Sequence, residues 1–218
     1  LPPRLTAHTG MDALAHAVEA YLGKSTHPIS DSFAREAVRL IGENLLKVFE
    51  DGGNVEGRHN MALASSMAGI AFDQSGLGIV HSLASPVCAD LHVPHGLAMA
   101  FLLPYGMEFN RKVRGERIAE IGKLLGADSE ADPGQSSIAE AAAATVQYVT
   151  KLRTQLGLED DFKQISAAFN EHKSTTGTDE ENFGKRAAEV FLMRNNPVQP
   201  SPAECGALFT KIFSEHTV

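Results

Sequence analysis

The sequence contains few cysteines, no long apolar run and no cluster of basic residues. Its two cysteines, Cys88 and Cys205, lie far apart and cannot form the disulfide framework of a small secreted domain. We therefore expect reduced thiols and a cytoplasmic location. No apolar run reaches the ~18 residues that a membrane-spanning helix needs. Residues 1–4 also lack the basic start and apolar core of a signal peptide.

Basic residues are outnumbered by acidic ones. The chain has 19 lysines and arginines, 27 aspartates and glutamates, and a formal net charge of −8. The basic residues are scattered singly or in short groups, whereas a surface that binds nucleic acid needs them clustered. We therefore exclude nucleic acid as a partner and interpret the acidic surplus as a solvated surface.

Stretches that alternate apolar and polar residues, as β-strands do, are also missing. Helical periodicity runs through nearly all of the 218 residues, and the 43% hydrophobic content suffices for a real core. The predicted fold class is all-α, with about nine to ten helices in one multi-helix bundle domain, residues 1–218. The turn-rich, acidic segment 127–136 is expected to be an exposed loop.

Cap residues and breaks in the periodicity predict where the helices lie. Thr9 is expected to cap the first helix, Ser30 or Asp31 the second, and Asn54 the third. Pro104 is expected to kink or end the fifth helix. The helices after the third are predicted at about 76–90, 94–110, 114–126, 137–156, 161–172, 182–193 and 201–215, the last of them opened by Ser201 and Pro202.

Asp12 and His16 are the first pair of residues that can carry chemistry. They lie four residues apart in a helical segment, so both side chains leave the same face of the helix. Two ligands at this spacing can converge on one cation. A carboxylate beside such an apolar face would be costly to bury without a partner. For this pair alone, an ordinary Asp–His contact in the helix is the simpler interpretation.

His81 and His95 form a second candidate pair. His81 lies early in an apolar helical segment, and His95 begins the next helix directly after a proline. Taken singly, each is more simply explained as a satisfied core histidine. Four convergent candidates change that balance, because imidazole suits zinc and ferrous iron, and one carboxylate with three histidines can hold a single metal. Of the other histidines, His8 and His92 have a weaker claim, and the surface is expected to hold His27, His59, His172 and His216.

Several other catalytic motifs are missing. Gly76 and Gly78 do not follow a strand and are not followed by a third glycine, as a dinucleotide-binding fingerprint requires. Only Glu56 and His59 fit the Glu-x-x-His element that a di-iron bundle needs twice. The sequence has neither the Gly-x-Ser-x-Gly nucleophile elbow nor the His-Glu-x-x-His zinc motif.

The two stretches that hold the candidate ligands resemble the iron-containing (group III) alcohol dehydrogenase family. Residues 9–21, TGMDALAHAVEAY, are similar to the first helical signature of that family. Residues 78–86, with VPHG at 93–96 and Leu-Pro at 103–104, are similar to the second, and the interval of 14 residues between the two histidines also matches. The resemblance covers almost the whole chain and includes the turn at 196–200.

The resemblance implies that Asp12, His16, His81 and His95 are metal ligands, normally to Fe²⁺ and in some members to Zn²⁺. In that family the helical domain is joined to an N-terminal α/β domain that binds NAD or NADP, with the active site between the two. The sequence does not include this nucleotide-binding domain, which agrees with the missing cofactor loop. An opening on Pro2-Pro3 without an initiator methionine also predicts that the chain is part of a larger protein.

Ser85 marks a departure from the family pattern. Many members carry a second histidine one turn after the position of His81, where it faces the nicotinamide and the substrate. A serine hydroxyl can pass on a hydrogen bond, but it cannot hold a proton near neutral pH as imidazole can. We therefore expect the proton to leave through water, ribose hydroxyls or another group, or the activity to differ from that of the best-known members.

The activity implied is reversible hydride transfer between a nicotinamide cofactor and a small alcohol or aldehyde, with the metal as Lewis acid. The chain alone is expected to be inactive, and the full-length protein is expected to form a homo-oligomer. One alternative is a zinc polyol dehydrogenase of the glycerol dehydrogenase type, which metal analysis and a substrate panel would distinguish. The other is a helical metal-binding module without redox activity, which an upstream reading frame with a βαβ pattern would exclude.

Overall fold

The computed structural model describes residues 1–127 and 137–216, and the regular elements in these two ranges are all helical. This confirms the all-α fold class. The described residues form nine α-helices and one short 3-10 helix. They are α1 (Pro3–Leu22), α2 (Pro28–Glu50), α3 (Val55–Ser75), α4 (Ile79–Leu91), α5 (His95–Leu125), α6 (Ile138–Gln155), α7 (Glu159–Thr176), α8 (Glu180–Glu189), η2 (Phe191–Asn195) and α9 (Pro202–Glu215). None of these helices combines the length and the apolar character needed to cross a bilayer.

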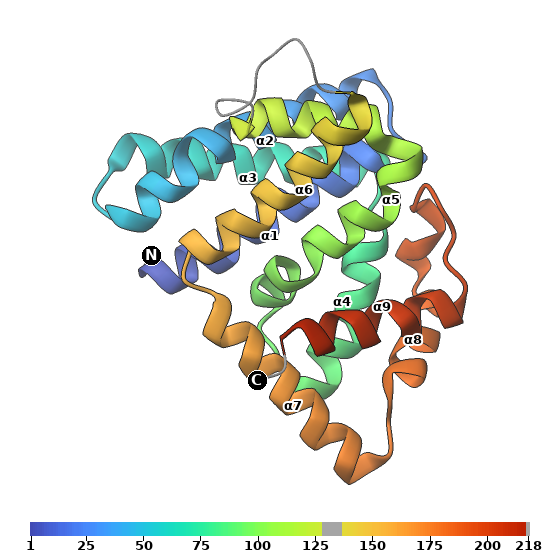
Figure 1. Ribbon diagram of the computed structural model, residues 1–218. Coiled ribbons are helices and arrows are strands. Elements are labelled where there is room, and N and C mark those ends of the chain that lie inside the picture. The colour runs from blue at the N-terminus through green and yellow to red at the C-terminus, as the bar shows by residue number, and fades with distance from the viewer. Residues whose placement is uncertain (128–136, 217–218) are drawn as a thin grey trace.

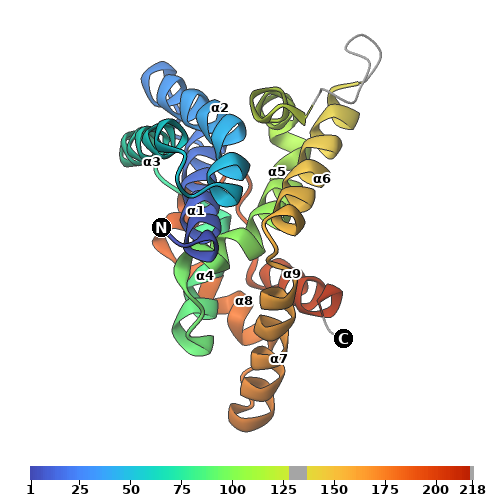
Figure 2. The ribbon, with the colours of Figure 1, turned by 90° about the vertical axis from the view of Figure 1, so that its left-hand side faces the viewer.

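The helices form three groups around α5. α1, α2 and α3 pack against one another, and α5 packs against both α1 and α6. α4 also contacts α5 and joins it to the group made of α7, α8 and α9. Figure 1 shows this last group at the bottom of the molecule, and the turned view in Figure 2 separates α5 and α6 from the layer of α1 to α3. The first turns of α4 and α5 both lie against α1, where the Val80 N–H donates to Glu19 and Gly96 approaches the His8 carbonyl.

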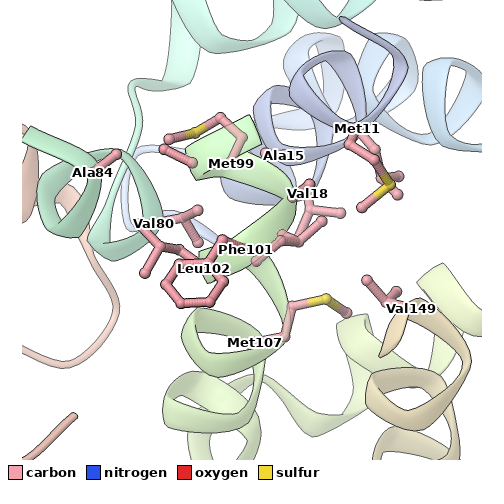
Figure 3. Packing of buried hydrophobic residues seen from close by; sticks show 14 of the residues in the cluster. Met11, Ala15, Val18, Val80, Ala84, Met99, Phe101, Leu102, Met107 and Val149 are labelled. Carbon is pink, nitrogen blue, oxygen red and sulfur yellow. The ribbon is translucent and has the colours of Figure 1, made fainter. Parts of the chain in front are cut away.

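The apolar core is centred on the first half of α5. Residues 97–107 of this helix are all buried, so it is enclosed on every side there rather than along one stripe. Figure 3 shows Met99, Phe101 and Met107 of α5 beside Val18 of α1, and Val149 of α6 near Met107. This shared core fixes α1, α4 and α5 relative to one another.

Two predicted helix caps are confirmed. The Asn54 side chain caps α3 by accepting a hydrogen bond from the N–H of Gly57 at 2.9 Å. The Ser201 hydroxyl caps α9 in the same way, and the Glu204 carboxylate accepts a hydrogen bond from the Ser201 N–H in return. This reciprocal arrangement satisfies free N–H groups at the helix end.

Two other predicted caps are wrong. α1 begins at Pro3, and the Thr9 hydroxyl lies inside the helix, where it donates to the Leu5 carbonyl at 2.9 Å. α2 begins at Pro28 and is capped by the His27 ring, with Ser30 at the third helical position. A proline in the first turn already has helical φ and lacks the N–H that would need a cap, so both helices begin earlier than polar cap residues predict.

The two helices predicted at 94–110 and 114–126 both lie within α5 and are joined by a kink at Arg114, where the prediction separated them. Pro104 does not end α5, and its one non-helical residue is Arg114, at φ −125° and ψ 22°. A proline inside a helix deprives the carbonyl four residues earlier of its donor. Here the buried Arg153 guanidinium lies 3.4 Å from that carbonyl, on Ala100. Of the predicted loop at 127–136, residues 128–136 lie outside the described residues.

Candidate metal centre

The four predicted ligands come from three helices that meet on one side of α1. α1 provides Asp12 and His16, α4 provides His81 in its first turn, and His95 is the first residue of α5. Donor atoms of Asp12, His81 and His95 lie within 4.8 Å of one another. Nε2 of His16 is 3.1 Å from Nε2 of His81, so the fourth residue adjoins the same group.

A close approach brings His95 to this position. A Cβ atom on Gly96 would lie 2.5 Å from the His8 carbonyl oxygen, so only glycine allows the start of α5 to lie this close to α1. As a result, His95 Nε2 is 3.4 Å from Asp12 Oδ1. On the other side, Phe72 of α3 packs against His16 with ring centroids 4.6 Å apart, which provides an apolar wall.

The protons on the histidine rings are directed away from the point where the rings meet. His16 Nδ1 is 2.8 Å from the Asp12 backbone carbonyl, and His81 Nδ1 is 2.5 Å from a Glu19 carboxylate oxygen. Both partners are acceptors, so each Nδ1 carries the proton and each Nε2 has a free lone pair. Two such lone pairs 3.1 Å apart repel each other unless a cation or a proton lies between them.

Asp12 provides a second sign of a missing partner. Its Oδ1 atom is buried and accepts no hydrogen bond from any described residue. Buried polar atoms are nearly always satisfied, and a carboxylate oxygen that lacks a donor favours a bound cation. The donor set of one carboxylate and three imidazoles fits Fe²⁺ or Zn²⁺ in its chemistry.

Burial and neighbouring charges keep the His16 ring and the Cys88 thiol uncharged at neutral pH. Burial lowers the pKa of His16 below its usual 6.5, and the neighbouring His81 lowers it further, so His16 is neutral at neutral pH. The Cys88 thiol lies beside the site, 4.0 Å from Nδ1 of His95. Burial raises the pKa of Cys88, and the Asp12 carboxylate raises it further, so this thiol is protonated under the same conditions.

The start of α4 is held by residues that the sequence analysis missed. Its first four N–H groups all have acceptors, although the cap residue is a glycine without a side chain. The acceptors are Asn196 Oδ1 for Ile79 at 3.2 Å, the Glu19 carboxylate for Val80 and His81 at 2.7 and 3.3 Å, and the Gly78 carbonyl for Ser82 at 3.1 Å. One signal could have found Glu19, since it continues the helical spacing of Asp12 and His16 along one face.

Ser85 and the histidines predicted at the surface differ in their exposure. Ser85 is exposed on α4, one turn after His81. Among the histidines expected at the surface, His59 is exposed. His27, His172 and His216 are partly buried instead, the last against the rings of Phe101 and Phe162. The aromatic neighbours that cover His172 and His216 come from other helices, so the residues next to each histidine in the sequence do not predict the burial.

Comparison with known proteins places this arrangement in a family. The sequence model described as "Fe-containing alcohol dehydrogenase family, C-terminal" matches residues 6–213. The chain is 36% identical over 215 residues to 1,3-propanediol dehydrogenase of Klebsiella pneumoniae, covering 97% of the chain and 52% of that protein. It is 34% identical over 213 residues to NADPH-dependent butanol dehydrogenase of Clostridium saccharobutylicum, covering 98% of the chain and 52% of that protein.

Solved structures agree with the sequence matches. The crystal structure of a 1,3-propanediol oxidoreductase superimposes with a TM-score of 0.87 at 33% identity, over 97% of this chain and 52% of the other. The chain thus spans about half the length of the relatives it matches. From the family model, these relatives and the shared fold, we conclude that the chain belongs to the Fe-containing alcohol dehydrogenase family and corresponds to its C-terminal part.

Proposed function

We propose that this chain is the metal-binding half of an NAD- or NADP-dependent alcohol dehydrogenase, in which Asp12, His16, His81 and His95 hold one divalent metal. The observation that carries the proposal is the meeting of donor atoms from three helices around an Asp12 oxygen that has no hydrogen-bond partner. The family description favours Fe²⁺ as this metal, and Zn²⁺ suits the same donor set.

The four side chains set the charge of the site. When bound, a divalent metal supplies Lewis-acid chemistry by drawing electron density from an alcohol or aldehyde oxygen. Three neutral imidazoles and one carboxylate do not neutralise a divalent cation, so a net positive charge remains to attract that oxygen. The His95 side chain is 52% exposed and that of His81 is 5% exposed. We therefore place the open side of the site at the start of α5.

The cofactor and the substrate class are inferred from the relatives. Their names specify a diol, butanol and the cofactor NADPH, which favours a small alcohol or aldehyde together with a nicotinamide nucleotide. We propose that the part of the relatives outside the matched region binds the nucleotide, so the 218-residue chain is expected to show no dehydrogenase activity alone. A homo-oligomeric state and a cytoplasmic location stay predictions.

Ser85 is the residue that we propose to relay the proton of the substrate hydroxyl. Its hydroxyl is exposed on α4, one turn after His81, and can both accept and donate a hydrogen bond. It cannot hold a proton near neutral pH, so we propose that it passes the proton between the substrate hydroxyl and water or a ribose hydroxyl.

The proposal is tested by measuring metal content. We expect the wild-type chain to bind one Zn²⁺ or, without oxygen, one Fe²⁺, and the double variant Asp12→Ala with His81→Ala to bind none. His59→Ala is the matched control, because it removes an exposed histidine elsewhere on the surface. An unchanged metal stoichiometry in the double variant would show that the ligand assignment is wrong. Anomalous scattering at the iron and zinc edges would identify the metal.

A zinc polyol dehydrogenase is the second candidate, and the name of the propanediol dehydrogenase relative favours the polyol substrate, though it gives no metal. Metal analysis and a panel of mono-alcohols, diols and glycerol, applied to the full-length protein, distinguish the two. Full-length protein that binds metal but oxidises none of these substrates with NAD or NADP would instead indicate a metal-binding module without redox activity.

A further inference from the structure

Glu19 is a buried carboxylate on α1, three residues after His16, with an unusual set of partners. The residue is 5% exposed. Within residues 1–127 and 137–216 its only ion-pair partner is His81, so no lysine or arginine offsets its charge. Burying a carboxylate is costly unless hydrogen bonds compensate for lost water. The hydrogen-bond donors around Glu19 therefore indicate which part of the structure its negative charge stabilises.

All of these donors belong to the first turn of α4. Oε1 accepts a hydrogen bond from the Val80 N–H at 2.7 Å, and Oε2 accepts one from the His81 N–H at 3.3 Å. Oε2 also lies 2.5 Å from Nδ1 of the His81 ring. The backbone bonds use the partial positive charge at a helix N-terminus and fasten α4 to α1. The bond to the ring reaches a proposed metal ligand.

We propose that Glu19 is a positioning residue for His81: its carboxylate keeps the ring proton on Nδ1 and so directs the lone pair of Nε2 into the metal site. This inference rests on the proposed function, because it assigns a role toward the metal. Nε2 of His81 is 3.1 Å from Nε2 of His16, at the centre of the site. A carboxylate behind a histidine ligand fixes the tautomer and the ring orientation and makes the ligand more basic.

The other two histidines have weaker supports. His16 Nδ1 is held by the Asp12 carbonyl of its own helix at 2.8 Å, which holds this ring through α1 alone. His95 Nδ1 faces the Cys88 sulfur at 4.0 Å, and its side chain is 52% exposed. His81 is thus the ligand whose Nδ1, on the side of the ring away from the site, is held by a charged side chain from another helix.

A glutamine of the same shape cannot replace Glu19. If its NH₂ group took the place of Oε1, it would face the Val80 N–H, and two donors would meet. If the NH₂ group took the place of Oε2, it would face the His81 N–H at the longer distance of 3.3 Å, donate to Nδ1 of His81 and move the ring proton to Nε2, into the metal site. The second arrangement removes the free lone pair that a metal ligand needs.

The test compares Glu19→Gln with the wild-type chain. We expect the dissociation constant for Zn²⁺ to rise roughly 10–100-fold, as is typical when such a supporting group is lost. In metal-free protein, ¹⁵N NMR of the imidazole rings should find the proton of His81 on Nδ1 in the wild type and on Nε2 in the variant. A purely structural role for Glu19 would not move the ring proton.

Asn196→Ala is the matched control. Asn196 caps the same turn of α4 by accepting the Ile79 N–H at 3.2 Å. Its loss should lower stability while leaving the Zn²⁺ affinity and the His81 tautomer unchanged. An unchanged Zn²⁺ affinity in Glu19→Gln, or an equal loss of affinity in both variants, would overturn the inference.

Three further outcomes keep the inference separate from the proposed function. If Glu19→Gln does not fold, the wild-type spectrum decides, because a His81 proton on Nε2 in the metal-free chain contradicts the role of Glu19. A wild-type chain that binds neither Zn²⁺ nor, without oxygen, Fe²⁺ would overturn the proposed function itself. Normal Zn²⁺ binding by both the wild type and Glu19→Gln would overturn only the inference about Glu19.

Discussion

Cys88 and Cys205 are both free thiols, but they differ in their surroundings. Cys205 on α9 is fully buried, and burial raises the pKa of its thiol to about 11. Cys88 on α4 is only partly buried, and its pKa is raised by burial and by the Asp12 carboxylate. Because the thiolate is the reactive form, both residues should be poor nucleophiles in the folded chain.

We predict that a disulfide reagent such as DTNB modifies Cys88 slowly at pH 8 and does not modify Cys205 until the chain is unfolded in urea. The variants Cys88→Ser and Cys205→Ser, measured separately, assign each kinetic phase to its residue. In urea, both thiols should react at similar rates, which provides the internal control. Equal rates for the two thiols in the folded chain would contradict the burial of Cys205.

At the scale of single residues, the sequence identifies the four candidate ligands more clearly than it identifies Glu19, which positions one of them. The spacing of Asp12 and His16 can be read directly, since a helix places such residues on one face. Glu19 is harder to recognise, because a glutamate in a helix is usually a solvated residue. Its role depends on α4, which begins 60 residues later in the chain, and no local pattern predicts that contact.

At the scale of the helices, the crossing of α8 and α9 depends on two glycines. A Cβ atom on Gly184 would lie 2.3 Å from the Gly206 nitrogen and 2.7 Å from the Pro202 carbonyl oxygen. Both of these atoms belong to the backbone, which cannot turn aside as a side chain can. The two helices therefore approach each other with no side chain between them at this point.

We predict that Gly184→Ala lowers the free energy of unfolding by roughly 1–3 kcal/mol or more, as overpacking does. Gly69→Ala is the matched control, because a Cβ atom there meets no neighbour within 4 Å in the middle of α3. It should raise stability by about 0.5–1 kcal/mol, since alanine favours a helix more than glycine does. Urea unfolding of both variants provides the measurement, and a Gly184→Ala chain as stable as the wild type would disprove the close packing.

Helix positions follow from the sequence better than helix ends do. Periodicity locates the described α-helices because most of them bury one apolar face, whereas the first half of α5 is apolar and buried on every side. The ends of α1 and α2 are missed because a proline starts each helix and the polar side chain expected to cap it lies further along. α5 continues past Pro104, and Arg153 of α6 lies near the Ala100 carbonyl that the proline leaves without a backbone donor. That contact is set by tertiary structure.

At the scale of the whole molecule, two histidines far apart in the sequence link stability to pH. His8 of α1 is 8% exposed, and its Nε2 atom has no hydrogen-bond partner among the described residues. His216 follows α9 and packs against Phe101 and Phe162. Burial lowers the pKa of both below the value of 6.5 for an unperturbed histidine, and nearby Arg153 lowers that of His216 further.

The folded and unfolded states of the chain bind different numbers of protons between pH 7 and pH 5.5. As the pH falls through 6.5, the unfolded chain takes up protons on these two histidines, while the folded chain keeps them neutral until a lower pH. The unfolded state then binds more protons, so acidification favours unfolding, and each extra proton contributes a slope of about 1.4 kcal/mol per pH unit. We predict that the free energy of unfolding falls as the pH is lowered from 7 toward 5.5.

Urea unfolding in EDTA at several pH values measures this slope without a contribution from bound metal. The double variant His8→Gln with His216→Gln should have a shallower slope than the wild type, whatever its stability at neutral pH. His59→Gln, which changes an exposed histidine, should keep the wild-type slope. A double variant with the full wild-type slope would show that other groups link stability to pH. A chain that becomes more stable on acidification would contradict the burial of these rings, because a ring protonated more easily in the folded state must be exposed or paired with a carboxylate.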